Sequence, residues 1–166
     1  MAEEQAAAQE QPQAQFSMQR IYTKDVSFES PNSPDVFRKP YQPKVTVDLN
    51  TKSNGLEEED TFEVILSITI TAKVEEDTAF LIEVQQAGIF LIAGFDPEQR
   101  RRVLGTTAPG ILFPYAREAI DSLAVKGGFP AIMLAPVNFD ALYEQALAQA
   151  MQQADQQANG AAEPTA

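Results

Sequence analysis

The stretch from Thr78 to Ile92 constrains the fold most, because its apolar and polar side chains alternate with a period of two. Successive side chains of a β-strand point to opposite faces, so the pattern predicts a strand with one dry face and one solvated face. After Gly88 an unbroken apolar run, 89–92, leaves no face for water. The expected dry face carries Phe80, Ile82, Val84 and Gln86, and the expected wet face carries Leu81, Glu83 and Gln85.

Three further strands are predicted before this stretch, at 21–29, 44–50 and 62–71. Each shows the same alternation and is rich in β-branched and aromatic residues. The proline-rich segment 31–43 predicts an ordered extended loop, because four prolines are incompatible with a helix. Turn residues and an acidic run at 51–60 predict the connection between the second and third strands. We expect four antiparallel strands in a meander or a simple Greek key.

The first strand places two kinds of side chain on opposite faces. Tyr22, Val26 and Phe28 fall on one face, which we expect to be dry. Asp25 and Glu29 fall on the other face, two pleats apart. Both carboxylates are therefore expected to be exposed.

Helix signals begin only after the last strand. Asp96-Pro97-Glu98 provides an N-cap, a proline at the first helical position and an acidic first turn, for a helix that runs to Gly105. A second helix is predicted over 109–126, and Asn138 caps a third. Strands followed by helices predict an α+β domain, a four-stranded antiparallel sheet with C-terminal helices packed on one face. The apolar stripe of the third helix comprises Phe139, Leu142, Tyr143, Ala146, Leu147, Ala150 and Met151.

The length of 166 residues corresponds to one domain with a sizeable core. The segments 1–15 and 154–166 are low in complexity and rich in Ala, Gln and Glu, so we expect disordered tails around a domain at 16–153. The N-terminus lacks the charged and apolar regions of a secretory signal, and no stretch is long enough to span a membrane. A cytoplasmic location is the expectation.

The composition excludes most catalytic chemistry. The chain has no histidine and no cysteine, so the usual general base, nucleophiles and zinc ligands are missing. No phosphate-binding glycine loop or nucleophile motif is present. We expect no enzymatic activity, no metal site and no cofactor. The formal charge of −12 argues against nucleic acid and favours basic proteins or segments as partners.

The wet face of the sheet allows two interpretations. It combines carboxylates with one apolar side chain, and these residues are Asp25, Glu29, Leu81 and Glu83. They form either an ordinary solvated sheet surface or a docking surface for a basic partner. In the second case charge steers the partner and Leu81 anchors it.

A second candidate site lies in the loops, which hold many large apolar residues: Phe37, Tyr41, Phe129, Ile132, Met133 and Leu134. They cover one end of the core, or they line a groove that accepts extended apolar segments of another chain. Pattern alone does not choose between the two.

Four segments closely resemble the SecB family of bacterial export chaperones. They read RIYTKDVSFESPNSPDVF from Arg20, AFLIEVQQAGIF from Ala79, GILFPYARE from Gly110 and LAPVNFDALY from Leu134. The similarity covers about 16–151 in the same order and spacing. It implies a cytosolic homotetramer, a dimer of dimers, that binds unfolded precursors without ATP and delivers them to the motor ATPase SecA. An acidic adaptor that recruits a folded basic protein is the alternative.

The resemblance also assigns roles to residues. The SecA-docking positions of the family match Asp25, Glu29, Leu81 and Glu83 here, and the family partner is a basic, zinc-stabilised segment. The client grooves of the family place 129–137 at a rim. Family positions linked to clients also match the dry face of the last strand, where we expect packing or assembly instead. Ile82 replaces a frequent family cysteine without a functional consequence.

Overall fold

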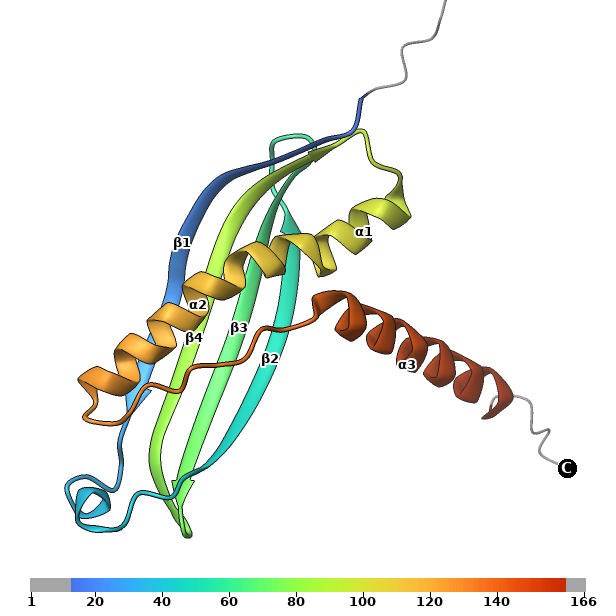
Figure 1. Cartoon of the computed structure of the whole chain (residues 1–166). Coiled ribbons are helices and arrows are strands. Elements are labelled where there is room, and N and C mark those ends of the chain that lie inside the picture. Colours follow the sequence, from blue (N-terminus) through green and yellow to red (C-terminus); the bar gives the residue numbers. More distant parts are fainter. Residues whose placement is uncertain (1–12, 161–166) are drawn as a thin grey trace, which may run out of the picture.

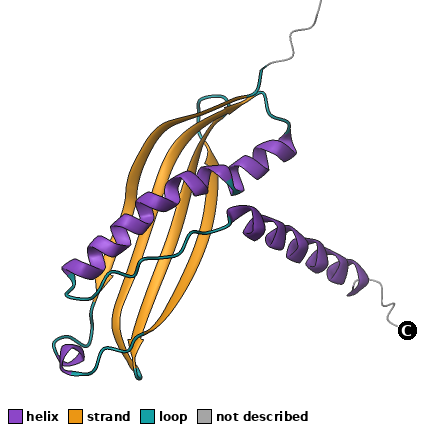
Figure 2. Ribbon diagram, in the orientation of Figure 1, coloured by secondary structure: helices purple, strands orange, loops and turns teal. Residues whose placement is uncertain are grey.

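The computed structural model describes residues 13–160 and consists of one sheet and a helical layer (Figure 1). The strands and helices are segregated, with the helices on one side of the sheet (Figure 2). This confirms the α+β class. The elements are β1 (Gln15–Glu29), the 3₁₀ turn η1 (Asp35–Arg38), β2 (Lys44–Gly55), β3 (Thr61–Val74), β4 (Asp77–Ala93), α1 (Pro97–Gly105), α2 (Thr107–Lys126) and α3 (Phe139–Gly160).

The sheet is a simple Greek key with the strand order β1-β4-β3-β2, and all its pairs are antiparallel. Hairpins join β2 to β3 and β3 to β4. The segment 30–43 carries the chain from β1 at one edge to β2 at the other, and its Val36 is buried. The two edge strands are therefore β1 and β2.

The alternation along β4 is confirmed. Phe80, Ile82, Val84 and Gln86 are buried beneath the helical layer, where Gln86 Nε2 donates to the carbonyl of Tyr22 at 2.9 Å. A buried amide with a partner supports packing without the cost of an unpaired polar group. Beyond Gly88 burial still alternates, contrary to the prediction: Phe90 and Ile92 are buried, whereas Ile89 and Leu91 are only half covered. The strand remains regular here, because β1 pairs with β4 as far as residue 93 and β3 as far as residue 91.

The prediction for Tyr22 is wrong. A β-bulge in β1 leaves Lys24 without a partner on β4, between the pairs Thr23–Gln86 and Asp25–Gln85. The extra residue shifts the alternation, so Tyr22 lies on the outer face, away from the helices. Ile21, the residue before Tyr22, points to the other face and packs against the core. Local sequence does not show the bulge, because it is defined by the pairing with β4.

The second strand is longer than predicted. Its residues 51–55, which resemble a turn, pair with 62–66 of β3 and extend β2 to Gly55. The turn lies in the acidic segment 56–60 instead. Pairing with a long central strand here outweighs the turn preference of Asn54-Gly55.

The first two helices follow the sequence signals closely. Asp96 accepts a hydrogen bond from the Gln99 amide at 2.8 Å and forms a capping box at the start of α1. The second helix crosses β3 and β4 obliquely and ends where Gly128 adopts a φ of +87° (Figure 1). A Cβ at Gly88 would lie 2.8 Å from the Phe90 ring and 3.0 Å from Leu112 of α2, so only glycine permits this close approach.

The third helix begins as predicted but packs differently. The Asn138 side chain accepts a hydrogen bond from the Ala141 amide at 3.0 Å, which caps α3. The helix contacts α1 and α2 and then projects past β2 (Figure 1). Only the start of its apolar stripe is buried, because α2 already covers the central strands: Phe139 lies in the core, whereas Leu142, Leu147 and Met151 are exposed.

The predicted tails fall largely outside the described residues. Residues 1–12 and 161–166 lie outside them, whereas Gln15 already pairs in β1. Residues 154–160 continue α3, because alanine and glutamine are good helix formers. Between residues 13 and 160 no helix has the length and apolar character required to cross a membrane.

Candidate binding surfaces

The first candidate surface is the outer face of β1 and β4, opposite the helices. Cross-strand pairing places Glu29 directly opposite Leu81, and Ser27 opposite Glu83. Asp25 pairs with Gln85, one pleat further along the same face. The structure therefore brings Asp25, Glu29, Leu81 and Glu83 together on two adjacent strands, because antiparallel partners point to the same side of a sheet. We call these four residues the outer acidic surface.

The carboxylates of the outer acidic surface are exposed, whereas Leu81 is half-buried. Within residues 13–160 none of the three carboxylates forms an ion pair. Asp48 of β2 adds a fourth carboxylate to this face, because it pairs with Thr69, which pairs with Glu83. The surface therefore offers negative charge around one apolar side chain, which suits a basic partner.

A polar network that the sequence did not reveal lies further along the same face. Glu63 of β3 accepts hydrogen bonds from Lys24 Nζ at 2.6 Å and from the Tyr22 hydroxyl. The Lys24 ammonium, and next the Tyr22 hydroxyl, lower the pKa of the Glu63 carboxyl. Burial and the neighbouring carboxylate raise the pKa of Tyr22 to about 12. The network depends on the β1 bulge, which no local pattern indicates.

The second candidate surface is an apolar cleft on the inner face, between β2 and the connector 129–137. One part has a volume of about 400 Å³ and is lined by Tyr41, Pro43, Val45, Val47 and residues 130–135. A second part of about 300 Å³ continues along β2 and also contains Val47, Leu134 and Ala135. The shared residues make the two parts one elongated cleft, which we call the β2 cleft.

Four of the six predicted groove residues line the β2 cleft. They are Tyr41, Ile132, Met133 and Leu134, and Met133 is 77% exposed at the rim. Phe129 is only 5% exposed and lies in the core, with its ring centroid 4.7 Å from that of Phe80. Phe37 covers Phe129 at a centroid distance of 5.0 Å and does not line the cleft.

Sequence reasoning missed the contribution of β2 to this cleft. Val45, Val47 and Leu49 alternate onto the inner face, as expected, but Val47 remains 45% exposed. Among the helices between residues 13 and 160, none covers this part of β2, because α2 lies over β3 and β4 and α3 projects away (Figure 1). A further hollow of about 550 Å³ begins at Leu49 and runs between β2 and α3. Its walls include Leu104, Leu142 and Leu147.

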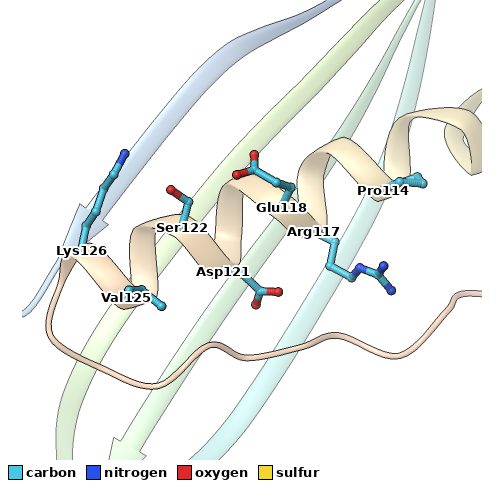
Figure 3. A pocket seen from close by; sticks show the side chains of 7 residues that line it. All are labelled: Pro114, Arg117, Glu118, Asp121, Ser122, Val125 and Lys126. Carbon is cyan, nitrogen blue, oxygen red and sulfur yellow. The ribbon is translucent and has the colours of Figure 1, made fainter.

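A third hollow, of about 570 Å³, lies along α2, and five of its seven lining residues are polar or charged (Figure 3). Its seven lining residues all come from this one helix, so it is an open helix surface rather than an enclosed site. Across residues 13–160, no three acidic side chains are grouped as metal ligands would be. The apolar and acidic surfaces above remain the candidates for binding.

Comparison with known proteins identifies the family. A family model described as preprotein translocase subunit SecB matches residues 8–150. The protein-export protein SecB of Azotobacter vinelandii is 56% identical over 143 residues, which cover 86% of this chain and 88% of that protein. The protein-export protein SecB of Hahella chejuensis is 57% identical over 144 residues, with coverages of 87% and 89%.

A solved structure supports the fold. A SecB-like chaperone of Mycobacterium tuberculosis, in complex with a peptide from an antitoxin, matches with a TM-score of 0.62 at 15% identity, over 74% of this chain and 91% of that one. The sheet and helical layer are thus common to both. The family match and the relatives at 56–57% identity show that the chain belongs to the SecB family of protein-export chaperones, which are not enzymes.

Proposed function

We propose that this chain is an ATP-independent holdase, which binds unfolded precursors, keeps them competent for translocation and delivers them to SecA. The observation that carries the proposal is the separation of two surfaces by one sheet. The β2 cleft lies on the inner face and the outer acidic surface lies on the other. A client and a basic partner can then be bound at the same time.

The β2 cleft suits extended apolar segments. Its walls are aliphatic and aromatic, and burial of such segments contributes about 25 cal/mol per Å² of apolar surface. The cleft has no ordered array of polar groups that would select a sequence, so many weak contacts along one client add up. Slowly folding precursors are favoured as clients, because folding of the precursor competes with its binding to the cleft.

The outer acidic surface is assigned to SecA. Unpaired carboxylates at positions 25, 29 and 83 steer a basic segment, and Leu81 gives it an apolar anchor. The chain works as a cytoplasmic homotetramer, a dimer of dimers. Two observations support this assembly: the edge strand β1 pairs only with β4, and α2 exposes Tyr115 and Val125 to solvent.

The direct test of the function is suppression of aggregation. We expect the purified chain, without nucleotide, to prevent light scattering when a denatured precursor is diluted into buffer. It should bind the unfolded precursor and not the same protein after folding. A preference for the folded form would instead indicate an adaptor without chaperone activity.

The SecA surface is tested by a charge reversal. Glu83→Lys should weaken SecA binding at least tenfold, because it places a cation at the centre of the outer acidic surface. Glu57→Lys makes the same change of charge in the exposed turn between β2 and β3 and should have little effect. Binding to an unfolded client, measured by calorimetry, should be the same in both variants. Loss of client binding in Glu83→Lys alone would argue against separate surfaces.

A further inference from the structure

The connector between α2 and α3 is held by two side chains of α2. The Asp121 Oδ1 atom accepts hydrogen bonds from the backbone amides of Ile132, at 2.9 Å, and Met133, at 2.8 Å. One turn earlier, Arg117 Nη1 donates to the carbonyl of Leu134 at 3.4 Å. Figure 3 shows Asp121 pointing toward the connector, whereas Glu118 points away from it. Three successive residues of an irregular segment are thus fixed by one face of a helix.

The hydrogen bonds coincide with an unusual backbone conformation. Met133 has a φ of +53°, in the left-handed region that side chains other than glycine rarely occupy. Such a conformation persists only where its surroundings enforce it. Here a single carboxylate oxygen binds the two successive backbone amides of Ile132 and Met133, and hydrogen bonds to a charged acceptor are the stronger kind.

The backbone conformation of the connector determines which of its side chains line the β2 cleft. Ile132 and Leu134 pack against the core and line the β2 cleft, whereas Met133 between them is exposed at its rim. If the connector relaxed to an ordinary extended conformation, these side chains would be reoriented. The two amides would also lose their acceptor and could bind elsewhere.

We propose that Asp121 is the positioning residue of the client cleft. Its carboxylate holds the connector in the one conformation that keeps Ile132 and Leu134 in the cleft wall and Met133 at its rim. It acts through the connector and does not touch the client. The inference rests on the proposed function, in that it takes the β2 cleft as the site of the unfolded chain.

Two variants of Asp121 and one matched control test the assignment. Asp121→Ala removes the hydrogen-bond acceptor. Asp121→Asn keeps an acceptor oxygen at the same position but removes the negative charge. Glu118→Ala deletes a carboxylate of the same helix that points away from the connector (Figure 3). The two measurements are hydrogen exchange of peptides covering 129–137, and the Kd for a reduced and alkylated, permanently unfolded basic protein.

We expect Asp121→Ala to raise amide exchange in 129–137 and the Kd by at least tenfold each, the size of effect expected for lost bonds to a charged acceptor. Asp121→Asn should lie between this variant and the wild type, and Glu118→Ala should match the wild type. Exchange in α2 and in the sheet should not change. If the hydrogen bonds of Asp121 served stability alone, Asp121→Ala would lower the melting temperature and leave the Kd of the folded variant for the unfolded basic protein unaltered.

Two results would overturn the inference, and a third would overturn the proposed function on which it rests. Unchanged exchange in 129–137 would show that Asp121 does not hold the connector, and faster exchange with an unchanged Kd would show that the cleft does not need it. If Asp121→Ala does not fold, the inference is tested by the same two measurements on Asp121→Asn. Failure of the wild type to bind the unfolded protein would overturn the proposed function itself, which no variant result can mimic.

Discussion

At the scale of single residues, Glu63 shows how the outer face combines exposure with order. Its side chain is only 12% exposed although it lies on the solvent side of β3. Lys24 and Tyr22 of β1 cover it, and both donate to Oε1. A carboxylate in this setting is stabilised in its charged form, so the network ties β1 to β3 across β4.

This network predicts a defined pH dependence. The lowered pKa of Glu63 in the folded state means that its contribution to stability is present above its ordinary pKa of 4.5 and is lost as the pH falls below that value. We expect Glu63→Gln to cost about 1 kcal/mol of unfolding free energy at neutral pH. In thermal melts the difference from the wild type should shrink as the pH falls below 4.5 and should disappear once it is below the lowered pKa of the folded state. A difference that stays constant down to acid pH would contradict a charged Glu63.

At the scale of elements, α3 is attached through a small set of polar contacts. The Arg102 guanidinium of α1 donates to Glu144 at 2.7 Å and to Asp140 at 3.0 Å, and it lies over the Tyr143 ring. The hydrogen bonds that Arg102 donates to Glu144, and next to Asp140, raise the pKa of Arg102. These partners of Arg102 all lie on the first two turns of α3.

Loss of this contact should loosen α3 alone. We expect Arg102→Gln to increase hydrogen exchange several-fold in peptides covering 139–147 and to leave α2 unchanged. About 1 M salt, which shortens the Debye length to about 3 Å, should have a similar effect on the wild type. Arg101→Gln is the matched control, since Arg101 forms no ion pair within the described residues. An equal loss of protection in both variants would contradict the role of Arg102.

Sequence patterns predicted the elements whose causes are local. The alternation of β4 and the Asp96 cap of α1 depend on neighbouring residues, and both are confirmed. The face of Tyr22 and the length of β2 depend on the register with another strand, which a single sequence does not show. Four groove residues were found from their apolar excess, but Phe129 was not distinguishable from them, because a core residue and a cleft residue look alike in sequence.

At the scale of the whole molecule, the chain leaves several surfaces without a partner. The edge strands β1 and β2, the solvent side of α2 and the stripe of α3 all expose backbone or apolar groups. The formal charge of −12 opposes non-specific association, so contacts between copies must be specific. These features together favour a closed symmetric assembly.

The proposed assembly has a direct test in native mass spectrometry. We expect a dominant species of four times the 18.2 kDa chain mass at micromolar concentration, and dimers as the first product of dissociation. Tyr115→Glu should shift the population toward smaller species, because it places a charge on the exposed side of α2. A monomer at all concentrations would contradict the tetramer.

The bulge at Lys24 also bears on how the chain tolerates insertions and deletions. Lys24 has no cross-strand partner, so its deletion would leave every other side chain of β1 on its present face and would remove only its bond to Glu63. Deletion of one residue within 81–85 of β4 would instead exchange the two faces beyond it, turning Phe80 outward or Glu83 inward. Changes of length are therefore tolerable at the bulged Lys24 of β1 and disruptive within 81–85 of the central strand β4.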